Sequence, residues 1–429
     1  MTKKTWNVGI AGLGTVGGGL LQFLNERPDF APVPGKVVVA GVSARSRTRP
    51  RSVDISDYPW FDDPVALATD KSVDIFVELI GGSDGPAKAA VEAALKAGKP
   101  VVTANKALIA EHGAELAVIA EAHNAPLLFE AAVMGGTPAV KMLREAMVGD
   151  EVDEVAGILN GTCNYILSEM ETTGRPFADV LAEAQRLGYA EADPTMDVGG
   201  FDAAHKISIL AAFAFRCAPT FSAAEIEGID EVELLDIKLA RDLGYRIKLV
   251  ASADKTDEGV AVRVHPSLVA QGHPLAETPG ALNALFIEGR RIGRIFIQGA
   301  GAGAGPTAAA VAADIADAMT GASRPVFHGP AGELRPFVAL PPTARVGKAY
   351  LRMLVRDEAG VIAAVSETLA ECGVSIDSFL QKPVEDAGGV PIVLTTHATP
   401  ESVLMDAINR IERLDAVLER PRLLRIARI

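Results

Sequence analysis

The segment Trp6-Asn7-Val8-Gly9-Ile10-Ala11-Gly12-Leu13-Gly14-Thr15-Val16-Gly17 runs from an apolar strand into a glycine-rich turn near the N-terminus. The turn has the spacing G-x-G-x-x-G, and the residues after it are typical of a helix that ends near Glu26. In this context the glycines permit a tight turn and let backbone N–H groups approach a pyrophosphate at the helix N-terminus. The pattern favours a dinucleotide-binding turn, formed by Gly12, Leu13, Gly14, Thr15, Val16 and Gly17, over a plain strand-to-helix turn.

Residues 6–130 continue this rhythm, because apolar runs alternate with Ala-rich helical segments. The expected strands are 6–11, 37–43, 73–79, 100–103 and 127–130. Near-continuous apolar strands joined by helical crossovers indicate a parallel sheet that is buried on both faces. The fold class is therefore α/β, with a Rossmann-type domain over residues 1–134 that helix 306–320 rejoins.

The rhythm changes near residue 135, where several helices precede short strands such as 249–253 and 294–298. These elements predict a second, α+β domain over residues 135–335, which contains the cluster of carboxylates described below. A third unit, residues 349–429, follows Pro341-Pro342 and has the order βαββαβ of a ferredoxin-like domain. We expect this last unit to be separable, so that its removal leaves catalysis.

The composition excludes several classes of protein. Apolar residues make up 49% of the chain and charged residues 22%, as in a globular α/β protein. The net charge of −14 argues against a nucleic-acid surface and favours a small-molecule partner. Three widely spaced cysteines indicate neither a disulfide framework nor a zinc site. No membrane span or signal peptide is expected, so the predicted location is the cytoplasm.

The end of the second strand bears on the choice of cofactor. A domain strict for NAD usually carries an acid there for the ribose 2′-hydroxyl, but this chain has Ser43. Arg45 and Arg47 follow, and a guanidinium can face a 2′-phosphate. We therefore expect NADP(H) to be preferred and NAD(H) to be possible, unless these arginines belong to a solvated loop.

Two further segments leave the carboxyl edge of the predicted sheet, where open α/β folds bind ligands. Lys106, after the fourth strand, can reach cofactor or substrate there, although a lone lysine is often solvated. Glu130 opens a glycine-containing turn, 130–137, whose carbonyls and carboxylate are oxygen ligands suited to a hard cation. A plain turn at a domain junction is the alternative.

The stretch 184–206 concentrates charge within an apolar sequence. Asp202 and Lys206 are four residues apart on an expected helix, so both project from one face. Gly188 and Gly199-Gly200 indicate loops that can bring Glu191 and Asp197 toward that face. Carboxylates beside a lysine can hold an amino-acid substrate and supply a proton, whereas the alternative is a solvated ion pair.

The same stretch carries a resemblance to a known family. The pattern A-x3-G-Y-A-x2-D-P-x2-D-V-x-G-x-D-x3-K, met in full from Ala184 to Lys206, resembles the signature of homoserine dehydrogenases. Other similar segments extend the resemblance over about residues 6–330. Residues 349–429 resemble an ACT domain, and no aspartate-kinase region precedes the first strand. The resemblance implies the monofunctional form of that enzyme.

The implied reaction is the reversible NAD(P)H-dependent reduction of L-aspartate 4-semialdehyde to L-homoserine, in threonine and methionine biosynthesis. By resemblance, Lys206 is the proton donor to the carbonyl oxygen and Asp202 orients it. Glu191 binds the substrate ammonium group, Asp197 lies nearby, and Lys106 contacts both cofactor and substrate. A protonated lysine suits this role because it stabilises a developing alkoxide and then neutralises it.

The resemblance also implies sites around this centre. Gly188 and Gly303 border the nicotinamide, and Arg45 belongs to the cofactor site. A sodium site is expected at Glu130, Val133, Gly135 and Thr137. We further expect threonine as an effector of the ACT domain, and a homodimer or homotetramer.

Two rival hypotheses stay open at this point. One is a semialdehyde dehydrogenase that acts through a thiohemiacetal at Cys163, with His205 as base. The other is a non-catalytic amino-acid sensor, in which the C-terminal domain alone is functional.

Overall fold

Six parallel strands form the N-terminal sheet of the computed structural model, which describes residues 4–30, 35–256, 258–321, 324–341, 345–381 and 388–429. Their order in space is β3-β2-β1-β4-β5-β6. The strands are β1 (Thr5–Ala11), β2 (Lys36–Ser43), β3 (Trp60–Phe61), β4 (Ile75–Glu78), β5 (Val101–Thr103) and β6 (Leu127–Leu128). The predicted parallel sheet is confirmed, and the short β3 is an addition at its edge.

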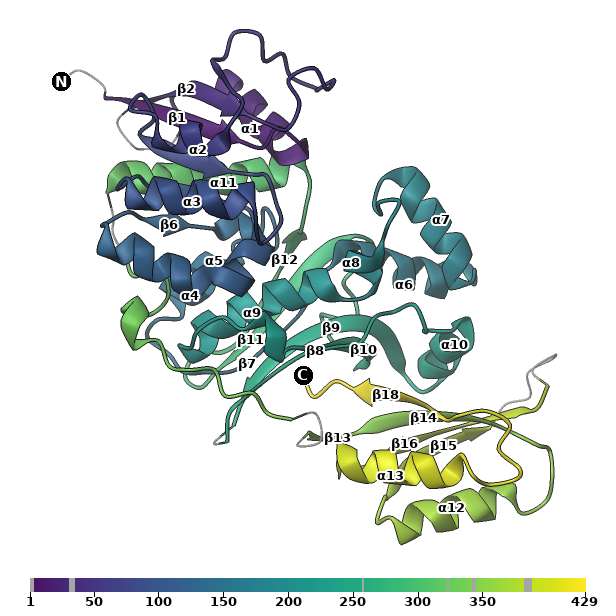
Figure 1. Ribbon diagram of the computed structural model, residues 1–429. Coiled ribbons are helices and arrows are strands. Elements are labelled where there is room, and N and C mark those ends of the chain that lie inside the picture. The colour runs from purple at the N-terminus through teal and green to yellow at the C-terminus, as the bar shows by residue number, and fades with distance from the viewer. Residues whose placement is uncertain (1–3, 31–34, 257, 322–323, 342–344, 382–387) are drawn as a thin grey trace.

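Helices cover both faces of this sheet (Figure 1). One face packs against α2 (Pro64–Thr69), α3 (Pro86–Lys96) and α4 (Lys106–Ala122). The other packs against α1 (Thr15–Glu26) and α11 (Ala304–Thr320). Helix α11 comes from far along the chain and lies so close to α1 that a Cβ on Gly19 would be 2.6 Å from the Ala304 carbonyl oxygen. Among the described residues, no helix is long and apolar enough to cross a membrane.

The segment between β6 and α11 forms a second layer around a mixed sheet, of which one face is covered by helices. Its strands are β7 (Val152–Ile158), β8 (Glu225–Ile226), β9 (Tyr245–Lys255), β10 (Val260–Ala270), β11 (Leu282–Gly289) and β12 (Gly293–Ala300). Its helices are α5 (Ala139–Lys141), the π-helix η2 (Met142–Ala146), α6 (Gly161–Thr173), α7 (Phe177–Leu187), α8 (Thr195–Val198), α9 (Phe201–Phe215) and α10 (Leu234–Asp242). Short 3₁₀ turns are η1 (Glu130–Ala132), η3 (Phe221–Ala223) and η4 (Ala331–Glu333).

The strands of this second layer are longer than the sequence indicates. We expected short strands at 249–253 and 294–298, whereas β9 and β10 each span 11 residues. Pro266 and His265 lie inside β10, and a proline is a signal against a strand interior. Strand β9 nevertheless pairs with β10 antiparallel over its whole length, with Pro266 opposite Leu249.

The C-terminal unit has the predicted βαββαβ order. It comprises β14 (Ala349–Val355), α12 (Val361–Glu371), β15 (Ile376–Gln381), β16 (Val390–Thr396), α13 (Glu401–Ile411) and β18 (Arg422–Ile426), together with the two-stranded ribbon of β13 (Val346–Gly347) and β17 (Thr399–Pro400). Helices α12 and α13 pack on one face of its sheet.

This unit is joined to the preceding domain by more than a linker, so its expected separability stays a prediction to be tested. Strand β18 pairs with β14 on one side and runs parallel to β10 on the other, so one ten-stranded sheet passes through both units. Tyr350 and Arg352 of β14 are buried against α10, where both contact Asp236. The second face of the C-terminal sheet is thus covered by the preceding domain.

Candidate active site

The glycine-rich turn lies at the carboxyl edge of the N-terminal sheet, beside a cavity of about 600 Å³. Gly12 has a φ of +101°, and a Cβ there would lie 2.2 Å from the Leu79 carbonyl oxygen. A Cβ on Gly17 would lie 2.0 Å from the Gly12 carbonyl oxygen, which explains the close strand–helix packing. Gly14 faces open space instead. The turn therefore leaves room for a phosphate group at the start of α1.

Arginines line the outer part of this cavity. Arg45, Arg49 and Arg51 are among its lining residues, beyond the end of β2. Arg47 is not among the lining residues of this cavity, and its guanidinium lies 5.9 Å from the centre of the Trp60 ring. The prediction that Arg47 faces a 2′-phosphate stays untested, and Arg49 is a cavity-lining arginine that sequence reasoning missed.

Lys106 is placed by a hydrogen-bond network at the same edge. It is the first residue of α4, whose N-cap Asn105 accepts a hydrogen bond from the Leu108 N–H. Thr103 donates to the buried Glu78 carboxylate at 2.6 Å and accepts from the Asn105 N–H. Burial raises the pKa of Glu78. This network directs the start of α4 toward the second domain.

Lys206 lies on α9, where it is buried and held by two acceptors. Its Nζ donates to Asp202 Oδ2 at 2.7 Å and to the Leu159 carbonyl oxygen at 2.7 Å. The same carbonyl accepts a hydrogen bond of 2.9 Å from Asn283. An ammonium group has three donors, and the third has no partner among the described residues. It remains available to a substrate oxygen.

Asp202 binds two lysines, one from each domain. Its Oδ1 lies 3.1 Å from Lys106 Nζ, and its Oδ2 binds Lys206. Burial alone would raise the pKa of Asp202, but both lysines and the Asn160 hydrogen bond outweigh it and hold the pKa well below its usual range. Asp202 is therefore a carboxylate that fixes the two ammonium groups.

Asn160 completes the cluster and was missed from the sequence. Its amide donates to Asp197 Oδ1 at 2.7 Å and to Asp202 Oδ2 at 2.9 Å, while its oxygen caps α6 at the Cys163 N–H. Burial raises the pKa of Asp197. The signal available in the sequence was an Asn directly after an apolar strand and before a helix, which is an N-cap pattern.

The other predicted residues lie around this cluster. Glu191 is exposed, but its charge contributes to a raised pKa of Lys106, after the larger effect of Asp202. Gly188 ends α7 in the left-handed conformation and is exposed. Gly303 is the N-cap of α11, two residues after Gly301. A Cβ on Gly301 would lie 2.1 Å from Asn283 Cγ, so this loop reaches the residue that supports Lys206 through Leu159.

The turn 130–137 is buried between the two domains. Both carboxylate oxygens of Glu130 accept backbone N–H groups, from Val140 and Lys141. Burial, together with the charge of Asp314, raises the pKa of Glu130 to about 7. Thr137 Oγ1 lies 3.5 Å from the Ala300 carbonyl oxygen. The Glu130 side chain is thus already engaged as a helix cap.

Cys163 does not have the environment of a nucleophile. It is fully buried and donates to the Asp197 carbonyl oxygen at 3.1 Å. Burial raises the pKa of its thiol well above the ordinary value. His205 faces away from it, stacked on Phe221 at 4.0 Å and 3.4 Å from Glu111. This geometry argues against the thiohemiacetal mechanism.

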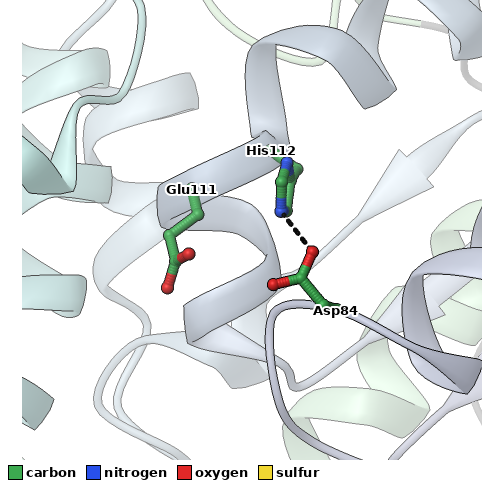
Figure 2. Close-up of side chains that lie close together, drawn as sticks. All are labelled: Asp84, Glu111 and His112. Carbon is green, nitrogen blue, oxygen red and sulfur yellow. Dashed lines mark hydrogen bonds and ion pairs between the residues drawn. The ribbon is translucent and has the colours of Figure 1, made fainter.

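A separate charged group lies near α4 (Figure 2). In the described part of the chain, Asp84, Glu111 and His112 place potential metal ligands within 4.8 Å of one another. His112 Nε2 lies 3.2 Å from Asp84, whose side chain is 75% exposed. Lys88 Nζ lies 3.2 Å from the other ring nitrogen of His112, so the histidine is already bonded on both sides. We assign no metal to this group.

Comparison with known proteins agrees with this geometry. Family models described as "Homoserine dehydrogenase, NAD binding domain", "Homoserine dehydrogenase" and "ACT domain" match residues 12–130, 138–316 and 349–413. A homoserine dehydrogenase from Neisseria gonorrhoeae is 42% identical over 97% of each chain. The crystal structure of one from Thiobacillus denitrificans has a TM-score of 0.92 and 40% identity, and covers 99% of this chain and 98% of its own.

A hyperthermophilic archaeal homoserine dehydrogenase in complex with NADPH has a TM-score of 0.65 and 28% identity. The match covers 75% of this chain and 99% of the archaeal one. The two catalytic family models together span more than half of the sequence. The chain therefore belongs to the homoserine dehydrogenase family, the NAD(P)-dependent oxidoreductases that interconvert L-aspartate 4-semialdehyde and L-homoserine.

Proposed function

We propose that Lys206 is the proton donor of this reaction and that Asp202 orients it. The supporting observation is the buried Asp202 carboxylate shared by Lys206 and Lys106. Two of the three Lys206 donors are occupied, so the remaining N–H has one direction available. A substrate carbonyl oxygen on that line receives the proton as its carbon is reduced, and a developing alkoxide is stabilised by the adjacent positive charge.

The substrate ammonium group is assigned to Glu191 and Asp197. Both carboxylates contribute to the raised pKa of Lys106, after the larger effect of Asp202, so both lie within electrostatic range of the cluster. Asp197 keeps one oxygen beyond the Asn160 hydrogen bond for a cation. Within the described residues, Lys106 Nζ pairs with Asp202 but donates to no backbone carbonyl, whereas Lys206 does. Lys106 can therefore contact both substrate and cofactor.

The cofactor residues are assigned to the cavity at the carboxyl edge of the N-terminal sheet. When bound, the nicotinamide group supplies or accepts the hydride. Gly12, Leu13 and Gly14 line the cavity, with Thr15, Val16 and Gly17 behind them at the start of α1. Arg45 and Arg49 support a preference for NADP(H) because both line the end where a 2′-phosphate would lie. Gly188 and Gly303 are assigned to the nicotinamide end.

A monovalent cation, Na⁺ in the first instance, is proposed at the turn 130–137. The carbonyl oxygens of Val133 and Gly135 receive no hydrogen bond within the described chain, which suits a hard cation. Thr137 is the third proposed ligand. Glu130 contributes charge rather than a free carboxylate oxygen. Rates in NaCl, KCl and choline chloride at equal ionic strength test this site.

We further propose that threonine acts through the ACT domain and that the chain is a cytoplasmic homodimer or homotetramer. The three cysteines are free thiols, which suits a reducing compartment. A threonine titration of the initial rate and light scattering during size exclusion test the effector and the assembly. The primary test of the function is NADPH oxidation with L-aspartate 4-semialdehyde. No turnover with either nicotinamide cofactor would refute the assignment.

A further inference from the structure

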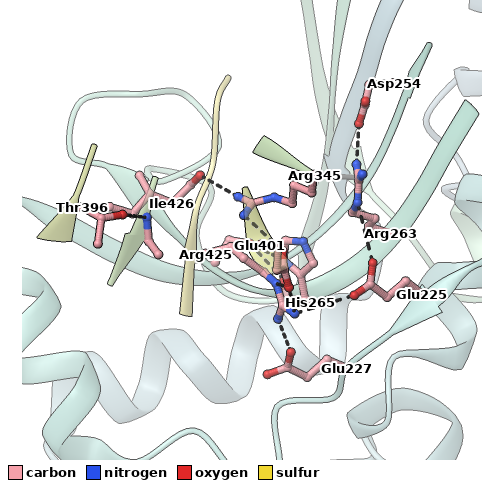
Figure 3. A network of polar contacts seen from close by, with 12 residues as sticks. Glu225, Glu227, Asp254, Arg263, His265, Arg345, Thr396, Glu401, Arg425 and Ile426 are labelled. Carbon is pink, nitrogen blue, oxygen red and sulfur yellow. Dashed lines mark hydrogen bonds and ion pairs between the residues drawn. The ribbon is translucent and has the colours of Figure 1, made fainter. Parts of the chain in front are cut away.

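The last strand of the ACT domain carries an arginine that reaches into the catalytic domain. The Arg425 side chain is 11% exposed and forms an ion pair with Glu227 (Figure 3). Within the ACT domain it also binds Glu401 at 2.7 Å. Arg422, on the same strand, lies 3.7 Å from Glu227 and 2.5 Å from Glu231. Two arginines of β18 thus hold one segment of the catalytic domain.

The first part of that segment, residues 227–229, lies directly on the backbone of α8. The Ile229 N–H donates to the Val198 carbonyl oxygen at 2.8 Å. A Cβ on Gly228 would lie 2.4 Å from the same oxygen, so no side chain separates the two backbones. A shift of Glu227 toward or away from β18 therefore moves the turn at Val198.

Val198 follows Asp197, whose other side is held by the active-site cluster. Asn160 binds the Asp197 carboxylate at 2.7 Å, and Cys163 binds its carbonyl oxygen at 3.1 Å. Asp197 is therefore held by contacts on two sides. On one side are Asn160 and Cys163 of the active-site cluster, and on the other Val198 contacts residues 228–229, which follow the Glu227 that pairs with Arg425.

We propose that Arg425 is a positioning residue for the substrate site, acting through Glu227 on Asp197. This inference rests on the proposed role of Asp197 toward the substrate ammonium group. An effector that displaces β18 would then change substrate affinity through this route, and substrate would change effector affinity by the same factor. The alternative is that the Arg425–Glu227 pair only joins the domains.

The test separates substrate affinity from cofactor affinity. We expect Glu227→Gln and Arg425→Ala each to raise the KM for L-aspartate 4-semialdehyde about five- to tenfold, with less than a twofold change in the KM for NADPH. Arg420→Ala is the matched control, because Arg420 pairs with Glu412 inside the ACT domain. Glu227→Gln carries the test if Arg425→Ala fails to fold. An unchanged substrate KM in folded Glu227→Gln overturns the proposal.

A double-mutant cycle that combines Glu227→Gln with Asp197→Asn tests whether Glu227 acts on the substrate site through Asp197. If Glu227 acts through Asp197, adding Glu227→Gln to Asp197→Asn changes the substrate KM less than twofold. The same five- to tenfold factor in both backgrounds would overturn the positioning role. An Asp197→Asn enzyme with an ordinary substrate KM would instead refute the proposed role of Asp197 in the site.

Discussion

The two large sheets of the molecule end in different ways. The N-terminal sheet is complete within its domain, and helices from two distant parts of the chain close over it. The mixed sheet continues from the catalytic domain into the ACT domain through β10 and β18. The cavity beside the glycine-rich turn lies at the edge of the first sheet, whereas α9, which carries Lys206, packs on the second sheet, which continues into the ACT domain. Changes at each sheet should therefore affect different parameters.

Lys206→Ala should have the largest effect, on turnover, and should leave cofactor binding at the first sheet unchanged. Loss of the proton donor is expected to lower kcat about 10²- to 10⁴-fold. NADPH binding, measured by fluorescence titration, should remain within twofold of the wild type because Lys206 lies outside the glycine-rich turn. Near-normal turnover in this variant would remove Lys206 from its proposed role.

Arg352→Ala should destabilise the packing of the ACT domain against the catalytic domain, where the second sheet is continuous. It leaves the fully buried Asp236 without its ion pair, which costs about 3–5 kcal/mol of the free energy of unfolding. Arg356→Ala, at the exposed residue directly after the same strand, is the control in urea unfolding. Removal of residues 349–429 also deletes β18, so we expect a poorly folded catalytic domain. A stable, fully active truncated chain would contradict the continuous-sheet argument.

Substitution of the arginines beyond β2 should change cofactor binding alone. Arg45→Ala and Arg49→Ala are each expected to weaken NADPH binding by about 1.5–3 kcal/mol, the value of a hydrogen bond to a charged group. NADH binding should change little because it lacks the 2′-phosphate. Arg47→Ala, stacked on Trp60, is the matched control. Equal NADPH/NADH ratios of kcat/KM in all three variants and the wild type would exclude a phosphate contact.

A buried base in the second sheet should give the smallest effect, on the pH dependence of stability. Burial lowers the pKa of Lys248 on β9 to about 8, from about 10.5. The unfolded chain therefore binds more protons between these values, and the free energy of unfolding should rise with pH by about 1–3 kcal/mol.

Lys248→Met should flatten this rise, whereas exposed Lys238→Met should retain it. Urea unfolding at pH 7, 8.5 and 10 measures both. Equal slopes for the wild type and Lys248→Met would show that another group titrates.

Local patterns were enough to predict the N-terminal sheet, and they also indicated Asp202 and Lys206, which the structure pairs. Gly12, Asp202 and Lys206 lie in contiguous motifs, so neighbouring residues carry the signal. The pairing of β18 with β10 involves only Ser267 and Leu268 opposite Arg425 and Ile426, about 150 residues apart in sequence. No local periodicity encodes such a contact. The sequence did not predict that both faces of β14 are buried, for the same reason. The second face packs against α10, which lies more than 100 residues earlier in the chain.

Single polar residues were equally hard to identify. Asn160 and Asn283 act through one side-chain amide each, and their partners lie about 40 and 120 residues away. The engagement of Glu130 by helix N–H groups and the stacking of Arg47 on Trp60 depend on side-chain directions. These directions are set by tertiary packing rather than by residue spacing.

Two of the segments that join the N-terminal and catalytic domains, residues 130–138 and 299–307, touch each other. A Cβ on Gly135 would lie 2.7 Å from the Gly301 carbonyl oxygen, and one on Gly136 would lie 2.7 Å from Pro306. A change in the angle between the two domains would have to bend the chain at this pair of segments. A methyl group at either glycine would push the two segments apart and so disturb the fit between the domains.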